Sequence, residues 1–281
     1  MTYVHLVIYA THSDGNFDIL VQKAHELGYY VSIIGWGDKW QGFYKRTLDL
    51  YDFFKTRPSQ EIIMCIDGFD SMILKDAETT LQTFASFESP IVWGVEESNS
   101  LLRKILFRSK QKYTLNGGSF MGYNEYLQLV FEEIVNRFGR DDFKQDDQRI
   151  VNIMNSKSLL FQEIVKPDLE SRIFANVIYS NLANTLIRNN KTLSHDVCGD
   201  SICHKKTGIS PCVVSGPGDV NLNPLLKQIG YEPKCRQDNY YKFFLANFKT
   251  EFILFTILLI CIIFAIFYLI RCLKRKNSLN K

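Results

Sequence analysis

The stretch "EIIMCIDGFDSMI", from Glu61 to Ile73, joins a short apolar run to two aspartates with a glycine and a phenylalanine between them. The apolar run has the length and composition of a buried β-strand. Asp67 and Asp70 follow where that strand ends. Ligands of open α/β sheets bind outside the carboxyl ends of the strands, so these two carboxylates mark a candidate binding site.

Strand and helix patterns alternate on both sides of this stretch. We expect strands at residues 3–10, 29–36, 61–66 and 90–95, and helices at 18–27 and 43–54. Strands separated by helices imply right-handed crossovers and a mostly parallel sheet covered on both faces. The predicted fold class is therefore α/β, with looser structure after about Lys157.

The composition bounds the architecture and the partners. A chain of 281 residues is long enough for one large or two small domains. The net charge of +3 is small and lies partly in the C-terminal tail, so no clustered basic face for nucleic acid is indicated.

The segment from Phe252 to Ile270, "FILFTILLICIIFAIFYLI", contains no charge, proline or glycine. At ~1.5 Å per helical residue it spans roughly the hydrocarbon core of a bilayer. A buried core helix, the alternative, would normally show a polar stripe. We therefore predict a domain at 1–238, a connector at 239–250, one transmembrane helix at 251–270 and a basic tail at 271–281, with the lipid bilayer as partner.

The side of the membrane that the large domain occupies is open, because two arguments conflict. Basic residues after the span place the tail in the cytosol and the domain outside. The N-terminus lacks the pattern of a signal peptide, however, and a lone span near the C-terminus resembles a tail anchor. We favour the second argument, which leaves the domain in the cytosol.

Four cysteines cluster late in the chain: Cys198, Cys203, Cys212 and Cys235. They could form two disulfides in an oxidising lumen, and they lack the paired spacing of a zinc site. Asn190 begins a glycosylation sequon, which matters only if the domain is lumenal.

The two aspartates have two interpretations. A divalent cation that binds diphosphate oxygens would neutralise the pair, since hard cations take carboxylate ligands. The alternative is a helix cap and a turn residue, the commoner reason for acidic residues after a strand.

Three further segments carry polar or glycine-rich patterns. Asn116, Gly117 and Gly118 precede an expected strand at 119–123, and adjacent glycines let backbone approach a ligand closely. Asp146 and Asp147 begin an expected helix, where acidic residues also suit the helix dipole. The segment "VVSGPGDVN", residues 213–221, is a glycine-rich turn able to offer N–H groups to phosphate.

The order of these motifs resembles that of a known family. The segments are "ATHSDG", "GWGDKW", "CIDGFD", "LNGGSFMGY", "DDQRIV" and "PDLESRIFAN". Together they are similar to the glycosyltransferase domain of the procollagen lysyl hydroxylases and of related viral and collagen-modifying galactosyl- and glucosyltransferases. The resemblance implies a GT-A (Rossmann-like) fold, UDP-glucose or UDP-galactose as donor, and Mn²⁺ or Mg²⁺ as cofactor.

The resemblance also implies roles for individual residues. Asp67 and Asp70 would hold the metal and the ribose or diphosphate, and Phe69 would lie near the uracil. Asn116 and Gly117 would line the donor sugar, with Gly118 beside them. Asp146 and Asp147 would face the sugar and the acceptor hydroxyl, and together with Asn116 they form the implied catalytic group. Those implied around the nucleotide are Thr11, Trp36, Gly216 and Gly218.

One position departs from the family pattern. Ser215 stands where the family has a histidine that completes the metal shell, and Asn221 stands near the position of a lysine. Asp219 is then the expected third oxygen ligand, with His195 or His204 as further possibilities.

The predicted function is transfer of a hexose from a UDP-sugar to an acceptor hydroxyl on an unknown protein or glycan by a membrane-anchored enzyme. The alternative is a catalytically inactive domain of the same fold that serves as a membrane-tethered binding or structural protein.

Overall fold

The computed structural model describes residues 3–96, 108–144, 146–179, 190–218, 220–234 and 249–279. Contacts within the chain divide it into two units, Met1–Asn239 and Tyr240–Lys281. Each unit is described by itself.

The first unit is built around one sheet, to which nine strands of the described residues belong. These are β1 (Val4–Tyr9), β2 (Tyr30–Ile34), β3 (Ile62–Asp67), β4 (Ser71–Ile73), β5 (Ile91–Glu96), β6 (Thr114–Tyr123), β7 (Val165–Asp168), β8 (Phe174–Asn176) and β11 (Val213–Ser215). Their order is β2-β1-β3-β6-β5-β8-β11-β4, with β7 beside β5. β6 runs antiparallel to β3 and β5, and β4 antiparallel to β11; the other pairings are parallel. The predicted α/β fold with a mostly parallel sheet is confirmed.

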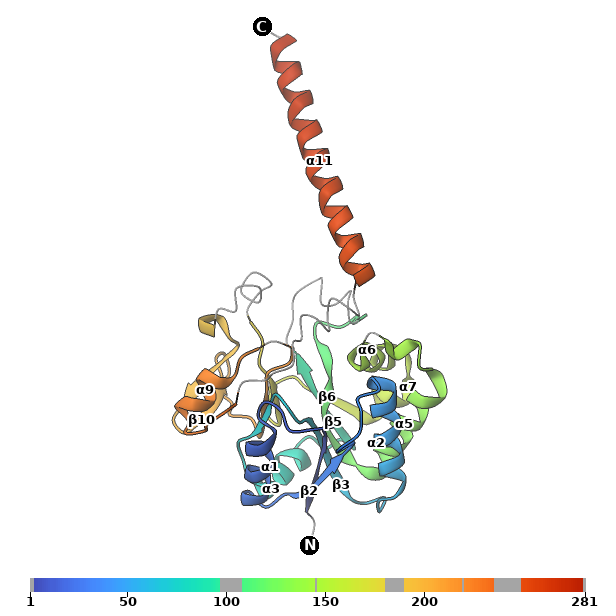
Figure 1. The fold of residues 1–281 in the computed structure, drawn as a ribbon, viewed down its shortest axis with the longest axis vertical. Coiled ribbons are helices and arrows are strands. Elements are labelled where there is room, and N and C mark those ends of the chain that lie inside the picture. The colour runs from blue at the N-terminus through green and yellow to red at the C-terminus, as the bar shows by residue number, and fades with distance from the viewer. Residues whose placement is uncertain are drawn as a thin grey trace. The chain divides into compact units, whose positions relative to one another are not determined.

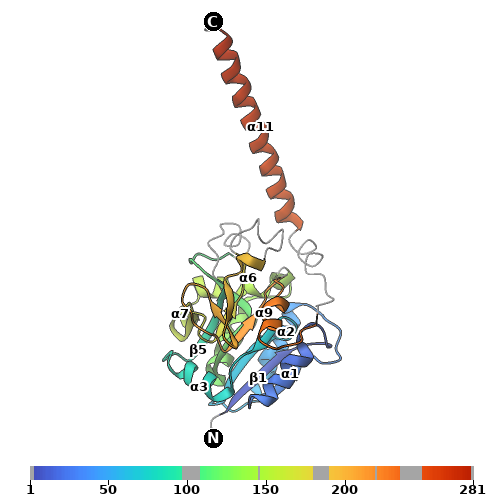
Figure 2. The same ribbon diagram turned by 90° about the vertical axis from the view of Figure 1, so that its left-hand side faces the viewer.

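Helices cover both faces of this sheet, as Figure 1 shows. The larger ones are α1 (Phe17–Glu26), α2 (Phe43–Lys55), α3 (Ala77–Ala85), α5 (Asn124–Arg137) and α6 (Asp147–Lys157). Alternate residues of β1 face opposite layers: Leu6 and Ile8 pack with α1 and α3, whereas Val7 packs with α2, α5 and α6. This period of two is what a strand buried on both faces requires. Figure 2 looks onto the side that α1 and α3 cover.

The segment after Lys157 holds more regular structure than its sequence pattern indicated. It forms α7 (Leu159–Ile164), β7, β8, a hairpin of β9 (His195–Cys198) and β10 (Ser201–His204), β11 and α9 (Asn223–Gln228), with a short 3₁₀ turn at Asn190–Thr192. These elements are only three to six residues long, too short for periodicity to be read from sequence.

The disulfide state of the late cysteines is resolved in part. A disulfide joins Cys198 to Cys203 across the turn of the β9–β10 hairpin, with Cα atoms 5.9 Å apart. Cys212 is a free, buried thiol, and Cys235 lies outside the described residues.

The strand expected at residues 119–123 begins earlier than predicted. β6 runs from Thr114, so Asn116, Gly117 and Gly118 lie inside the strand instead of before it. Glycine weakens the interior of a strand, which is why the sequence pattern suggested a loop. Here the glycines leave room for side chains of neighbouring elements.

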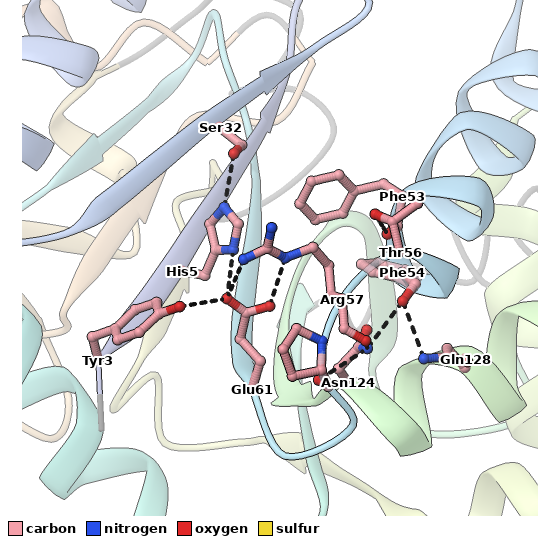
Figure 3. A network of polar contacts seen from close by, with 11 residues as sticks. Tyr3, His5, Ser32, Phe53, Phe54, Thr56, Arg57, Glu61, Asn124 and Gln128 are labelled. Carbon is pink, nitrogen blue, oxygen red and sulfur yellow. Dashed lines mark hydrogen bonds and ion pairs between the residues drawn. The ribbon is translucent and has the colours of Figure 1, made fainter. Parts of the chain in front are cut away.

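A polar network closes the edge of the sheet opposite Asp67, at the amino ends of β1 and β3 (Figure 3). Glu61 accepts hydrogen bonds from Arg57 Nε at 2.7 Å and from Tyr3 Oη at 3.0 Å, and its Oε1 lies 3.0 Å from His5 Nδ1. His5 Nε2 lies 2.8 Å from the hydroxyl of Ser32 on β2. The network ties the edge strand to the centre of the sheet.

The second unit contains α11 (Lys249–Leu279), a helix of 31 residues. The structure describes only some of its side chains. Among the residues that the structure describes, no helix is both long enough and apolar enough to cross a membrane.

Candidate active site at the carboxyl ends of the central strands

The candidate site begins where β1, β2 and β3 end together. Tyr9 pairs with Ile34 on one side and with Asp67 on the other, so the loops that follow leave the sheet at one edge. The amide of Gly37 donates to the carbonyl of Thr11 at 3.0 Å and joins two of these loops. This is the edge at which the sequence predicts a ligand.

β6 brings its glycines to the same edge because it runs antiparallel to β3. Cys65 pairs with Phe120, so Gly118 falls beside Asp67. A Cβ on Gly118 would lie within 2.5 Å of the carboxyl carbon and both carboxylate oxygens of Asp67. Only glycine at this position lets the carboxylate lie where it does.

Gly117 has the same relation to Asp147, the first residue of α6. A Cβ on Gly117 would lie within 2.9 Å of Asp147 Oδ1, of its Cγ and of the amide nitrogen of Gln148. The two adjacent glycines therefore hold two carboxylates from different elements against one strand.

Arg46 on α2 joins these two carboxylates. Its Nη2 lies 2.9 Å from Asp67 Oδ1, and its Nη1 lies 3.2 Å from Asp147 Oδ2. The side chain of Arg46 is only 8% exposed. Burial alone would lower the pKa of Arg46, but the two carboxylates raise it above its usual value, so the guanidinium stays charged.

The predicted acidic pair at the start of α6 is confirmed as a pair, although its members do different things. Asp146 caps the helix, and its Oδ1 accepts from the amide of Gln148 at 2.8 Å. Burial, reinforced by the charge of Asp147, raises the pKa of Asp146 well above its ordinary value. Burial also raises the pKa of Asp147, while Arg46 opposes that rise. Asp147 is thus the better candidate for an ionised carboxylate.

Asn116 lies beside this cluster with its side chain already hydrogen-bonded. Its Nδ2 donates to Glu96 at 3.1 Å, and its Oδ1 accepts from the amide of Gly118 at 2.7 Å and from Ser119. The indole of Trp93 donates to its carbonyl oxygen at 2.6 Å. In this arrangement Asn116 shapes the glycine segment that receives the carboxylates.

Aromatic side chains border the site on the loops after β1, β2 and β3. Trp36 is 53% exposed and stacks on Phe17 with ring centroids 5.0 Å apart. Phe69 is half-buried, and its ring lies 5.1 Å from that of His12. Flat, partly exposed rings at a strand edge offer surfaces on which a nucleobase can stack.

The late glycine-rich segment also reaches this edge. β11 pairs with β4 so that Ser215 faces Ser71, and the amide of Gly216 donates to the carbonyl oxygen of Asp70 at 2.9 Å. The hydroxyls of the two serines are 2.8 Å apart, and both residues are buried. Gly218 has a φ of +71°, as its turn requires.

With this geometry established, we compared the chain with known proteins. Residues 2–234 match the family model described as the PLOD GT domain. The chain belongs to the PLOD GT domain family. The resemblance that the motif order suggested is therefore confirmed at the level of a glycosyltransferase domain family. A comparison with curated protein sequences found no match.

Solved structures with a related fold include glycosyltransferases, at low similarity. The galactosyltransferase LgtC, in complex with donor and acceptor sugar analogs, is 12% identical with a TM-score of 0.41, covering 76% of this chain and 87% of its own. A glycosyltransferase involved in glycosylation of the major capsid of PBCV-1 is 9% identical with a TM-score of 0.39, covering 61% and 84%. A 4-diphosphocytidyl-2C-methyl-D-erythritol synthase from Anaerococcus prevotii is 12% identical with a TM-score of 0.33, covering 59% and 86%.

The donor set of this PLOD GT domain suits a cation that is shared with a diphosphate. Asp67 and Asp70 carry the carboxylates that such a site would use, and the side chain of Asp67 is 39% exposed despite its contact with Arg46. No group of three or more metal-binding side chains occurs among the residues that the structure describes. Mg²⁺ sites of the nucleotide-dependent type need only one or two carboxylates, because substrate phosphates supply further ligands. The residues present fit that type.

Three further residues were expected from the sequence as possible metal ligands. Asp219 lies outside the described residues. His195 and His204 face each other in the β9–β10 hairpin with ring centroids 5.0 Å apart, and both are buried. Burial lowers the pKa of His195 to about 3, so it is neutral near physiological pH. The two histidines are components of this hairpin.

Arg46 is the functional candidate that the sequence analysis missed. Helical spacing places it on the same face as Leu50 and Phe54, which are buried in the core. A charged residue on an apolar helix face must meet an opposite charge, and this signal was present in the sequence.

Proposed function

We propose that this PLOD GT domain transfers a hexose from UDP-glucose or UDP-galactose to an acceptor hydroxyl, using Mn²⁺ or Mg²⁺. The observation that carries the proposal is the cluster of Asp67, Arg46 and Asp147 against Gly117 and Gly118. It places two carboxylates and a guanidinium, from three elements, at the sheet edge where α/β folds bind nucleotides. The membership of the family supports the same reaction class.

Each residue has a role in this proposal. Asp67 and Asp70 hold the cation with the diphosphate, and the cation neutralises charge that develops on the leaving group. Phe69, Trp36 and the backbone near Thr11 border the base and ribose.

On the acceptor side, we assign Asp147 to the hydroxyl. Its carboxylate is paired with Arg46, which favours the ionised form needed to accept a proton. The turn that follows β11 lies near Asp70, because the amide of Gly216 donates to the carbonyl oxygen of Asp70; this leaves Gly218 to offer a backbone N–H group to the phosphates.

The second candidate is a catalytically inactive domain of the same fold that serves as a membrane-tethered binding or structural protein. The specific observation in its favour is Ser215, whose hydroxyl contacts Ser71 and supplies no imidazole to a metal. The intact acidic cluster favours the enzyme.

The deciding experiment measures UDP release by the full-length chain with Mn²⁺ and a panel of UDP-sugars. Asp70→Ala should reduce UDP release by about 100-fold or more, since a misplaced cation loses most of the stabilisation of the leaving group. Asp52→Ala is the matched control, because Asp52 is exposed on α2 and pairs only with Lys55 among the ion pairs of the described residues. Equal rates in the two variants would refute the site.

The silent alternative has its own signature in calorimetry. If UDP with Mn²⁺ binds only in the millimolar range or weaker, and Asp67→Ala leaves that binding unchanged, the binding-only reading is favoured.

We further propose that the chain is anchored in a membrane through the apolar segment at 251–270, on the evidence of its composition. The acceptor would then lie near a bilayer. Protease protection of the large domain in intact vesicles tests its side, and glycosylation at Asn190 provides a cross-check. A chain that is recovered in the aqueous fraction without detergent would contradict the anchor.

A further inference from the structure

Among the ion pairs of the described residues, those of Arg46 reach both the proposed cation site and the proposed acceptor-side acid. Asp67 ends β3, and Asp147 begins α6; Arg46 reaches both from α2. We propose that Arg46 is a positioning residue that couples the two carboxylates, so that the arrangement at Asp67 sets the arrangement at Asp147. This inference rests on the proposed function and deepens it.

The geometry of the contacts supports coupling over simple charge neutralisation. Arg46 gives a separate nitrogen to each carboxylate, at 2.9 Å and 3.2 Å, and the guanidinium is planar and rigid. A displacement of one carboxylate therefore tilts the group that holds the other. An ammonium carries its three donors on one freely rotating nitrogen, so it would not fix the two carboxylates relative to each other.

The carboxylates are also confined by the backbone of β6. The hydrogen atoms of Gly118 and Gly117 stand where any other residue would place a Cβ into Asp67 and Asp147 respectively. Each acid thus contacts both the guanidinium and the backbone of β6. Little freedom remains for one to move independently of the other.

The helix that carries Arg46 is itself well anchored. The backbone amide of Arg46 donates to the carbonyl oxygen of Gly42 at 3.3 Å. Leu50 and Phe54, on the same face of α2, are buried in the core. The guanidinium carbon lies 6.0 Å from the centre of the Tyr9 ring, a cation–π contact from β1. Arg46 has a rigid base from which to transmit a displacement.

The two carboxylates differ in access, which gives the coupling a direction. The side chain of Asp67 is 39% exposed, whereas that of Asp147 is 13% exposed. A ligand reaches Asp67 first, and its effect passes inward through Arg46. We infer that binding of the nucleotide and cation at Asp67 adjusts Asp147 for the acceptor.

The first test separates cation binding from turnover in the full-length chain. Mn²⁺ binding in the presence of UDP is measured by electron paramagnetic resonance, and kcat and KM are measured by UDP release. In Arg46→Gln, Mn²⁺ should bind at least as tightly as in the wild type because a nearby positive charge is removed. The kcat value should fall by about 100-fold, because Asp147 loses its positioning.

Arg46→Lys and Lys45→Gln complete the set. The lysine variant keeps the charge and should fold normally, yet it should restore only part of kcat, since it lacks the planar fork that fixes both carboxylates. Lys45 is the neighbouring cation on α2, pairs with Asp49 and should leave both readouts unchanged. Wild-type kcat in Arg46→Lys, or loss of Mn²⁺ binding in parallel with kcat in Arg46→Gln, would overturn the coupling role.

A double-mutant cycle on Mn²⁺ binding needs no activity. The effect of Asp147→Asn on Mn²⁺ affinity should differ by at least about threefold between the wild-type and Arg46→Gln backgrounds. Equal effects in the two backgrounds would overturn the inference. If the wild type releases no UDP while the cycle shows coupling, the proposed function fails and the inference about Arg46 stands.

Discussion

Replacing Gly118 with alanine tests the geometry on which the site depends. The new Cβ would lie within 2.5 Å of the carboxyl carbon and both oxygens of Asp67, so that side chain must rotate away. Rotation breaks the 2.9 Å contact with Arg46, which is buried. A hydrogen bond between charged groups contributes about 1.5–3 kcal/mol, and we expect the lower end because Asp67 is partly solvated.

The expected result of Gly118→Ala is a loss of stability together with a loss of ligand binding. A loss of about 1.5 kcal/mol lowers Tm by roughly 3–6 °C in a domain of this size. UDP release should fall by about 100-fold, because the residue proposed to hold the cation is displaced. Thermal melting and calorimetry with UDP and Mn²⁺ measure the two effects in the same preparation.

Gly139→Ala is the matched control for this prediction. A Cβ at Gly139 would meet no atom within 4 Å, and both substitutions reduce the freedom of the unfolded chain alike. If the two alanine variants melt within about 1 °C of each other and bind UDP with Mn²⁺ equally, the reasoning about Asp67 is refuted.

Three further predictions concern other parts of the first unit. Burial lowers the pKa of His5 despite the opposing effect of Glu61, so the unfolded chain is protonated at a higher pH than the folded chain. The free energy of unfolding should therefore fall as the pH drops below about 6.5. Chemical denaturation should show a smaller fall in His5→Gln than in the wild type, and an equal fall would contradict this. Reduction of the Cys198–Cys203 disulfide should lower the free energy of unfolding by about 2 kcal/mol, because it opens a short closed loop; Cys198→Ser should reproduce the loss and then be insensitive to reductant. Ser215→Ala should cost about 1–2 kcal/mol through its lost hydroxyl contact, without weakening Mn²⁺ binding; weaker binding would show that the serine is a ligand.

The sequence predicted the parts of the fold that depend on long, periodic segments. The expected strands at 3–10, 29–36, 61–66 and 90–95 appear as β1, β2, β3 and β5, within two residues at each end. The helix at 43–54 appears as α2, with a difference of one residue at its end. Each of these elements is flanked by turn residues and carries one clear period, so local physics decides it.

The antiparallel course of β6 could not be predicted in this way. Its adjacent glycines, Gly117 and Gly118, break the strand pattern, and their purpose is visible only once Asp67 and Asp147 lie against them. These contacts join residues far apart in the chain, which a local pattern does not encode. The same limit hid the partners of Arg46, although its position on an apolar helix face could be read from the sequence.

The attachment of the late segment to Asp70 has an evolutionary consequence. Main-chain hydrogen bonds of β4 and β11, and the amide of Gly216, hold this segment in place. The side chain at position 215 can therefore change while the loop keeps its path. Variation at this position would change the side chain that is offered to the proposed cation site without changing the course of the main chain.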